Sequence, residues 1–123
     1  MPEEFAELMA DMKALTRAAT TSEAEETLPV AENEFKTRPN AVSYGIIHFE
    51  FEVSSLDGDN LKQERAFEGS MDLYSKEKHG DGWVPLIEEV LTRHCDSCWN
   101  LNYHEKEAGT NLFRWEWTFQ VEG

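Results

Sequence analysis

The stretch TRHCDSCWNLNYH, residues 92–104, contains both cysteines of the chain and two of its four histidines. Cys95 and Cys98 have the C-x-x-C spacing of many zinc and redox sites, and His94 and His104 flank them. A structural zinc ion needs four ligands that converge on one point at about 2.0–2.3 Å. The two thiols supply half of such a set, so the elements that position the histidines decide whether a site can form.

The elements expected around this stretch do not bring four ligands together. A helix over 82–94 places His94 at the end of its apolar stripe. A strand over 97–105 places Cys98 and His104 on its outer face, about 20 Å apart. Cys95 and Cys98 are therefore metal candidates only as an incomplete set, and we expect no cofactor. The pair also follows a helix C-terminus, where the dipole does not lower a thiol pKa. A packed thiol is the favoured role, and a disulfide formed under oxidation is the alternative.

Paired carboxylates are a second candidate for chemistry. Glu50 and Glu52 lie two residues apart on a predicted strand, which separates them by about 7 Å on one face, within the range of glycosidase acid pairs. A strand with alternating acidic residues produces such pairs whatever its function. The sequence contains no G-x-S-x-G, P-loop or G-x-G-x-x-G motif, and we expect that the protein is not an enzyme.

The apolar pattern predicts a single α+β domain over 1–123. We expect a helix over 2–18, whose apolar stripe packs in the core. An extended and partly flexible arm over 19–40 follows, because Pro29 and Pro39 interrupt a polar, acidic stretch. A body of sheet and helix occupies 41–123.

Within the body, strands over 42–54 and 64–76 form one hairpin, and strands over 97–105 and 111–122 form another. A helix over 82–94 separates the two hairpins. The order α-β-β-α-β-β favours one mostly antiparallel sheet of about four strands, with two helices on one face. The other face is acidic, and its long edge strands require a cover that assembly of several copies would provide.

Strand alternation assigns individual side chains to the two faces of the sheet. Leu101 and Tyr103 are expected to point inward with Trp99. Asp72 is expected to point outward with Glu68, on the acidic face.

Composition restricts the classes of partner. The chain has 25 acidic and 11 basic residues, and its net charge of −14 disfavours binding to nucleic acids and anionic membranes. No apolar run approaches the length of about 20 residues that spans a bilayer, and no secretory pattern is present, so we expect a soluble protein that is not exported. The charge is typical of a solvated surface, but it also suits a basic protein partner.

Several segments carry a resemblance to a known family. LPVAENEF, RPNAVSYGIIHFEFE, the loop DGDN, the strand–helix unit MDLYSKEKHGDGWVPLIEEVL and the terminal hairpin are together similar to the tail-terminator (tail-completion, minor tail) proteins of long-tailed phages and prophages. The resemblance covers roughly residues 3–122. It implies a structural protein of the virion tail, assembled in the host bacterial cytoplasm, that forms a ring, expected to be hexameric. Its implied partners are other copies of itself, the tail-tube protein and the head–tail connector protein.

On this interpretation the interfaces lie on the acidic outer face of the sheet, in the 55–63 hairpin loop and in the 19–40 arm. The candidates are Glu50, Glu52, Asp57, Asp59, Asn60, Lys62, Glu68 and Asp72. The alternative function is a small acidic inhibitor or DNA mimic that binds a basic protein. A small metalloprotein that uses Cys95 and Cys98 is a third possibility.

Overall fold

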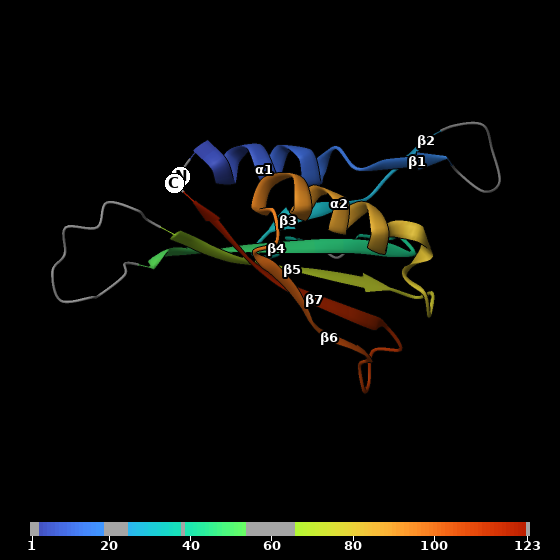
Figure 1. Cartoon of the computed structure of the whole chain (residues 1–123). Helices are drawn as coiled ribbons and strands as arrows, with labels where there is room; N and C mark the ends of the chain where they lie inside the picture. The colour runs from blue at the N-terminus through green and yellow to red at the C-terminus, as the bar shows by residue number, and fades with distance from the viewer. Residues whose placement is uncertain (1–2, 19–24, 38, 54–65, 123) are drawn as a thin grey trace, which may run out of the picture.

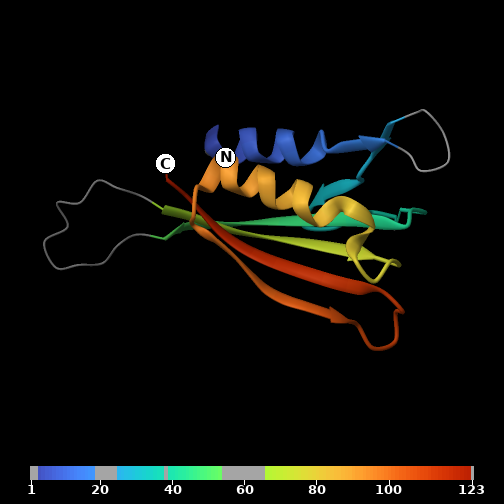
Figure 2. The same cartoon turned by 45° about the vertical axis from the view of Figure 1, so that its right-hand side comes forward.

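A computed structural model describes residues 3–18, 25–37, 39–53 and 66–122. In this part of the chain, two helices lie side by side on one face of a twisted five-stranded sheet, and the opposite face has no helix (Figures 1 and 2). The elements in chain order are α1 (Glu3–Lys13), β1 (Thr16–Ala18), β2 (Glu25–Thr27), β3 (Val30–Glu32), β4 (Ser43–Val53), β5 (Ala66–Ser75), the 3₁₀ helix η1 (Gly80–Gly82), α2 (Trp83–Cys95), β6 (Trp99–Lys106) and β7 (Phe113–Glu122).

The main sheet has the strand order β3-β4-β5-β7-β6. Four of its strands pair antiparallel, and β3 pairs parallel with β4 at one edge. The prediction of an α+β protein with two helices and a mostly antiparallel sheet is confirmed. The predicted number of four strands is wrong, because the sheet has five.

The additional strand, β3, lies in the segment predicted to be an extended arm. Leu28 is fully buried and Val30 packs against the core, so this part of the arm is anchored to the body. The Gly45 amide donates a hydrogen bond to the Pro29 carbonyl at 2.8 Å, which brings β3 alongside β4. The two prolines break a helix, as predicted, but they do not prevent an edge strand.

The first helix is shorter than predicted. It ends at Lys13, and Thr16–Ala18 forms β1, which pairs with β2 in a separate two-stranded sheet. Thr16 is β-branched and favours an extended backbone over the last turn of a helix. Leu15 is nevertheless buried, so the apolar stripe continues past the end of the helix.

The core fills the space between the two helices and the sheet. Its largest fully buried side chain is Trp117 on β7, whose indole Nε1 donates a hydrogen bond to Glu88 on α2 at 3.0 Å. Phe5 from α1 packs against both Phe49 and Phe119. The predicted apolar stripes of both helices are confirmed as core, so the two helices pack on the sheet within the chain.

Candidate functional site

Planar side chains form a continuous row across the helix-free face of the sheet. Phe35 meets Tyr44 edge to face at 5.7 Å between ring centroids, and Tyr44 stacks on Tyr74 at 5.1 Å. The guanidinium of Arg114 lies 5.9 Å from the Tyr74 ring and 5.3 Å from the Tyr103 ring. We call these five residues the tyrosine–arginine row. Tyrosine and arginine are enriched in protein interfaces, so the row favours a contact surface over a catalytic site.

Asp72 lies beside this row. The register places it on the helix-free face, as predicted, but it is only 5% exposed. Its carboxylate lies 3.5 Å from the Arg114 guanidinium and 3.9 Å from His48 Nε2. Among the described residues, Asp72 Oδ1 and Arg114 Nε have no hydrogen-bond partner. Asp72 is therefore a buried support for Arg114, whereas Glu116, which accepts a 2.7 Å hydrogen bond from Arg114, is more exposed.

The electrostatics of Asp72 are dominated by its burial. Desolvation raises the pKa of the Asp72 carboxyl above its usual range, although the positive charge of Arg114 acts in the opposite direction. The negative charge of Glu116 raises this pKa further, and His48 opposes it. The structure therefore holds a carboxylate on the open face of the sheet at a cost in solvation energy.

A β-bulge in β6 changes which side chains reach this face. The register with β7 shifts between Leu101 and Tyr103, so that Tyr103 lies opposite Glu116, on the helix-free face. His104 lies on the helix side instead, where its ring stacks on Trp115 at 4.4 Å. The predicted inward position of Tyr103 and the predicted outer position of His104 are both wrong. One extra residue in the bulge reverses the alternation of every residue that follows it.

The two cysteines flank the turn between α2 and β6, because Cys95 ends the helix and Cys98 directly precedes the strand. Cys95 is buried and Cys98 is exposed, and the Cys98 amide donates a 2.8 Å hydrogen bond to the Cys95 carbonyl. Burial raises the pKa of the Cys95 thiol to about 12, which makes this thiol a poor nucleophile at neutral pH. In the described ranges, no three His, Cys, Asp or Glu side chains lie close enough together to hold a metal ion.

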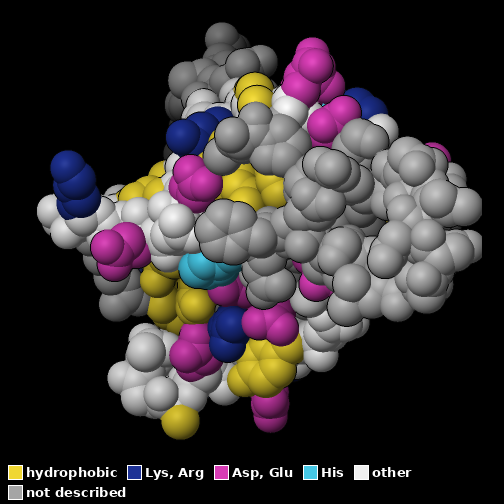
Figure 3. All heavy atoms as spheres, turned by 90° about the vertical axis from the view of Figure 1, so that its left-hand side faces the viewer, with side chains coloured by type: hydrophobic (Ala, Val, Ile, Leu, Met, Phe, Trp, Pro, Cys, Tyr) yellow, Lys and Arg dark blue, Asp and Glu magenta, His cyan; other side chains and the backbone are white. Residues whose placement is uncertain are grey.

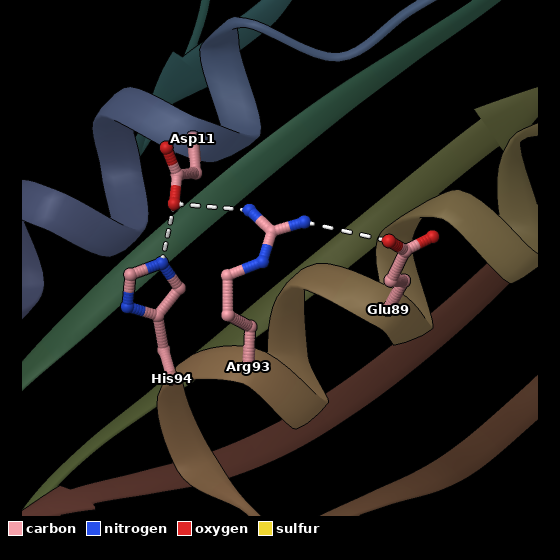
Figure 4. A network of polar contacts seen from close by, with 4 residues as sticks. All are labelled: Asp11, Glu89, Arg93 and His94. Atoms are coloured by element: carbon pink, nitrogen blue, oxygen red, sulfur yellow. Dashed lines mark hydrogen bonds and ion pairs between the residues drawn. The ribbon is translucent and has the colours of Figure 1, made fainter.

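His94 belongs to a polar network between the helices (Figure 4). Its Nε2 lies 2.6 Å from Asp11 Oδ2 on α1, and Arg93 donates to the same oxygen at 3.2 Å. Arg93 also pairs with Glu89 one turn earlier at 3.5 Å. The hydrogen bond from His94 and the charges of His94 and Arg93 lower the pKa of Asp11. The sequence offered no signal for this contact beyond the Glu89–Arg93 spacing, because 82 residues separate Asp11 from Arg93.

The remaining interface candidates are only partly placed. Glu68 lies on the helix-free face and accepts a hydrogen bond from Gln120 Nε2 at 3.0 Å. Glu50 and Glu52 lie in β4, but their side chains are outside the described part of the structure. Four candidates of the hairpin loop lie outside the described residues: Asp57, Asp59, Asn60 and Lys62.

The described part of the surface carries both charged and hydrophobic side chains. On the coloured part of Figure 3, acidic side chains lie beside hydrophobic ones, with a histidine among them. Among the described helices, none is long and apolar enough to cross a membrane. No family model and no curated protein matches this chain.

Proposed function

We propose that this protein is a structural virion protein of the phage tail-terminator type. It forms a ring that caps the tail tube, stops tube polymerisation and provides the surface for head joining. The observation that supports this proposal most directly is the edge strand β6. The expected hexameric state, the tail-tube and connector partners, and the location in the virion tail belong to the same proposal.

β6 has the properties of a strand that another chain covers. It is eight residues long and pairs with β7 on one side, and no other described strand pairs with it. An edge strand of this length presents unpaired backbone amides and carbonyls, which favour pairing with another chain. Leu101, in the middle of β6, is 42% exposed. The segment Trp99–Tyr103 has no charged residue that would discourage pairing.

The acidic character of the chain supports the same function. A net charge of −14 repels the phosphates of DNA, which suits a ring through which DNA passes without binding. The same charge supports the alternative function, an acidic inhibitor or DNA mimic. The two functions differ in stoichiometry, because the alternative requires a 1:1 complex with a basic protein and no self-assembly.

Sedimentation velocity of the full chain tests the proposal, alone and with the tail-tube protein, over a concentration series. We expect a discrete closed oligomer in at least one of these conditions. Leu101→Lys places a charge on the β6 edge and should abolish this species. Val42→Lys is the matched control, because Val42 is 43% exposed and lies outside β6.

Two outcomes would overturn the proposal. One is a protein that stays monomeric both alone and with the tail-tube protein. The other is an oligomer that both variants weaken equally, since that result would show that β6 does not lie in the interface. A salt-sensitive 1:1 complex with a basic nucleic-acid-binding protein, without self-assembly, would establish the alternative function instead.

A further inference from the structure

A pocket of about 410 Å³ opens on the helix-free face, where β5, β7 and the start of β6 meet. This volume lies in the lower part of the range for ligand pockets. Apart from Gly69 and Phe119, the described residues that line it carry polar side chains. They include Glu68, Ser70, Cys98, Asn100, Thr118 and Gln120.

The lining residues favour a cationic occupant. Among the described residues that line the pocket, Glu68 is the one carboxylate, and these residues include no lysine or arginine. Gln120 donates to one oxygen of the Glu68 carboxylate at 3.0 Å, which holds the side chain in place. Ser70 and Thr118 add hydroxyl oxygens, and Asn100 adds an amide oxygen, all of which accept hydrogen bonds. A ligand that is a positively charged donor would match this set.

Among the described residues, Arg114 on the same face of β7 is already paired. Arg114 interacts with Asp72 and Glu116 and stacks between two tyrosine rings, so it does not neutralise Glu68. His48 lies opposite Ser70 in the β4–β5 register, and its Nε2 faces the Asp72 carboxylate at 3.9 Å.

We propose that this pocket binds the guanidinium group of an arginine side chain from a basic segment of a partner protein. A guanidinium presents five N–H donors in one plane, and it can pair with a carboxylate while it reaches several neutral acceptors. A lysine ammonium has only three donors at one point and matches the dispersed oxygens less well. The net charge of −14 attracts such a partner over a longer range. The inference concerns a single copy of the chain and does not require ring formation.

The first test uses a five-residue peptide with one central arginine between glycines, capped at both ends. Its matched control is the same peptide with citrulline, which keeps the shape and loses the charge. Binding is followed at pH 8 by amide NMR shifts of the full chain. We expect saturable shifts at Ser70, Asn100 and Thr118, and affinity for the citrulline peptide lower by about tenfold or more.

Two variants separate the pocket from diffuse charge attraction. Glu68→Gln keeps the size of the side chain and should lower the affinity for the arginine peptide by about tenfold or more. Glu105→Gln removes one charge from the same face outside the pocket, and we expect the dissociation constant to change by less than about twofold. The amide spectrum of each free variant reports whether the fold is intact. Equal affinity for both peptides, equal effects of both variants, or no saturable shifts would each overturn the proposal.

Cys98 provides a second readout, because its thiol is exposed and lines the pocket while Cys95 is buried. The rate of Cys98 alkylation by iodoacetamide, a neutral reagent, should fall as the arginine peptide saturates the pocket. The citrulline peptide at the same concentration should leave the rate unchanged. Equal rates with the two peptides would contradict a pocket occupied by the guanidinium.

Discussion

Asp11 and Asp72 lie in opposite regions of the molecule, and each faces one arginine and one histidine. Asp11 lies between the two helices, with its side chain 40% exposed and oxygen Oδ2 2.6 Å from His94. The pKa of Asp11 is lowered, first by the hydrogen bond from His94. This carboxylate keeps much of its hydration and gains close partners.

Asp72 lies on the helix-free face with its side chain 7% exposed, and its partners are more distant. Arg114 is 3.5 Å away and His48 is 3.9 Å away. The pKa of Asp72 is raised, because the loss of hydration outweighs the attraction of these partners. The comparison teaches that partner type does not decide the direction of the shift, whereas burial and distance do.

The same contrast distinguishes the two faces of the sheet. The helix side is closed by apolar packing, and its ionic network lies at the surface. The helix-free side contains a buried carboxylate that supports Arg114 within a row of tyrosines. Such an arrangement is costly in an isolated surface, and it is consistent with the proposals that place partner contacts on this face.

The largest expected effect comes from two neighbouring residues of β5 that point to opposite faces. Leu73 is fully buried on the helix side, whereas Tyr74 lies in the tyrosine–arginine row. Leu73→Ala should lower the free energy of unfolding by about 3 kcal/mol through cavity formation. Tyr74→Ala should lower it by about 1 kcal/mol, through lost stacking and cation–π contact. Urea denaturation measures the free energy of unfolding of both variants. Equal losses would show that the two faces do not differ in their contribution to stability.

A smaller effect tests whether Arg114 is needed to balance the buried charge of Asp72. Arg114→Met leaves Asp72 buried without its cation, and we expect a loss of about 2 kcal/mol at pH 7. In the Asp72→Asn background the same change should cost less than about 1 kcal/mol, because no buried charge remains. A double-mutant cycle from urea denaturation measures this coupling. Additive single-variant losses would show that the two side chains do not depend on one another.

The smallest effects concern pH, and the two aspartates should respond with opposite signs. Because the folded-state pKa of Asp72 is raised, the stability of the wild type relative to Asp72→Asn should increase as pH falls from 7 toward about 4. The folded-state pKa of Asp11 is lowered. Asp11 should therefore stabilise the fold above about pH 4, and this contribution should be lost as pH falls further.

At pH 7, Asp11→Asn should cost only about 0.5 kcal/mol, since the pair is partly exposed, and added salt should reduce the difference. Thermal unfolding of the wild type and both Asn variants at several pH values measures these trends. Parallel pH profiles for the two variants would contradict the opposite directions of the two pKa shifts.

Sequence reasoning was most accurate where structure depends on residues close together in the chain. The predicted strand over 111–122 ends with β7 and starts two residues before it, and the predicted helix over 82–94 matches α2 within one residue. Both have strict apolar periodicity. Sequence reasoning was least accurate for Tyr103 and His104, because nothing in the sequence marks the bulge between Leu101 and Tyr103. The pocket was also missed, although Glu68, one of its lining residues, was among the interface candidates.

The sequence by itself determined the fold class, the core stripes of the two helices and the acidic character of the protein, because these follow from local side-chain periodicity and composition. Only the tertiary structure decided the place of β3, which depends on the burial of Leu28 and on a hydrogen bond between Gly45 and Pro29. It also decided the opposite pKa shifts of Asp11 and Asp72. Hydration and partner distance set those shifts, and both depend on residues that are far apart in the chain.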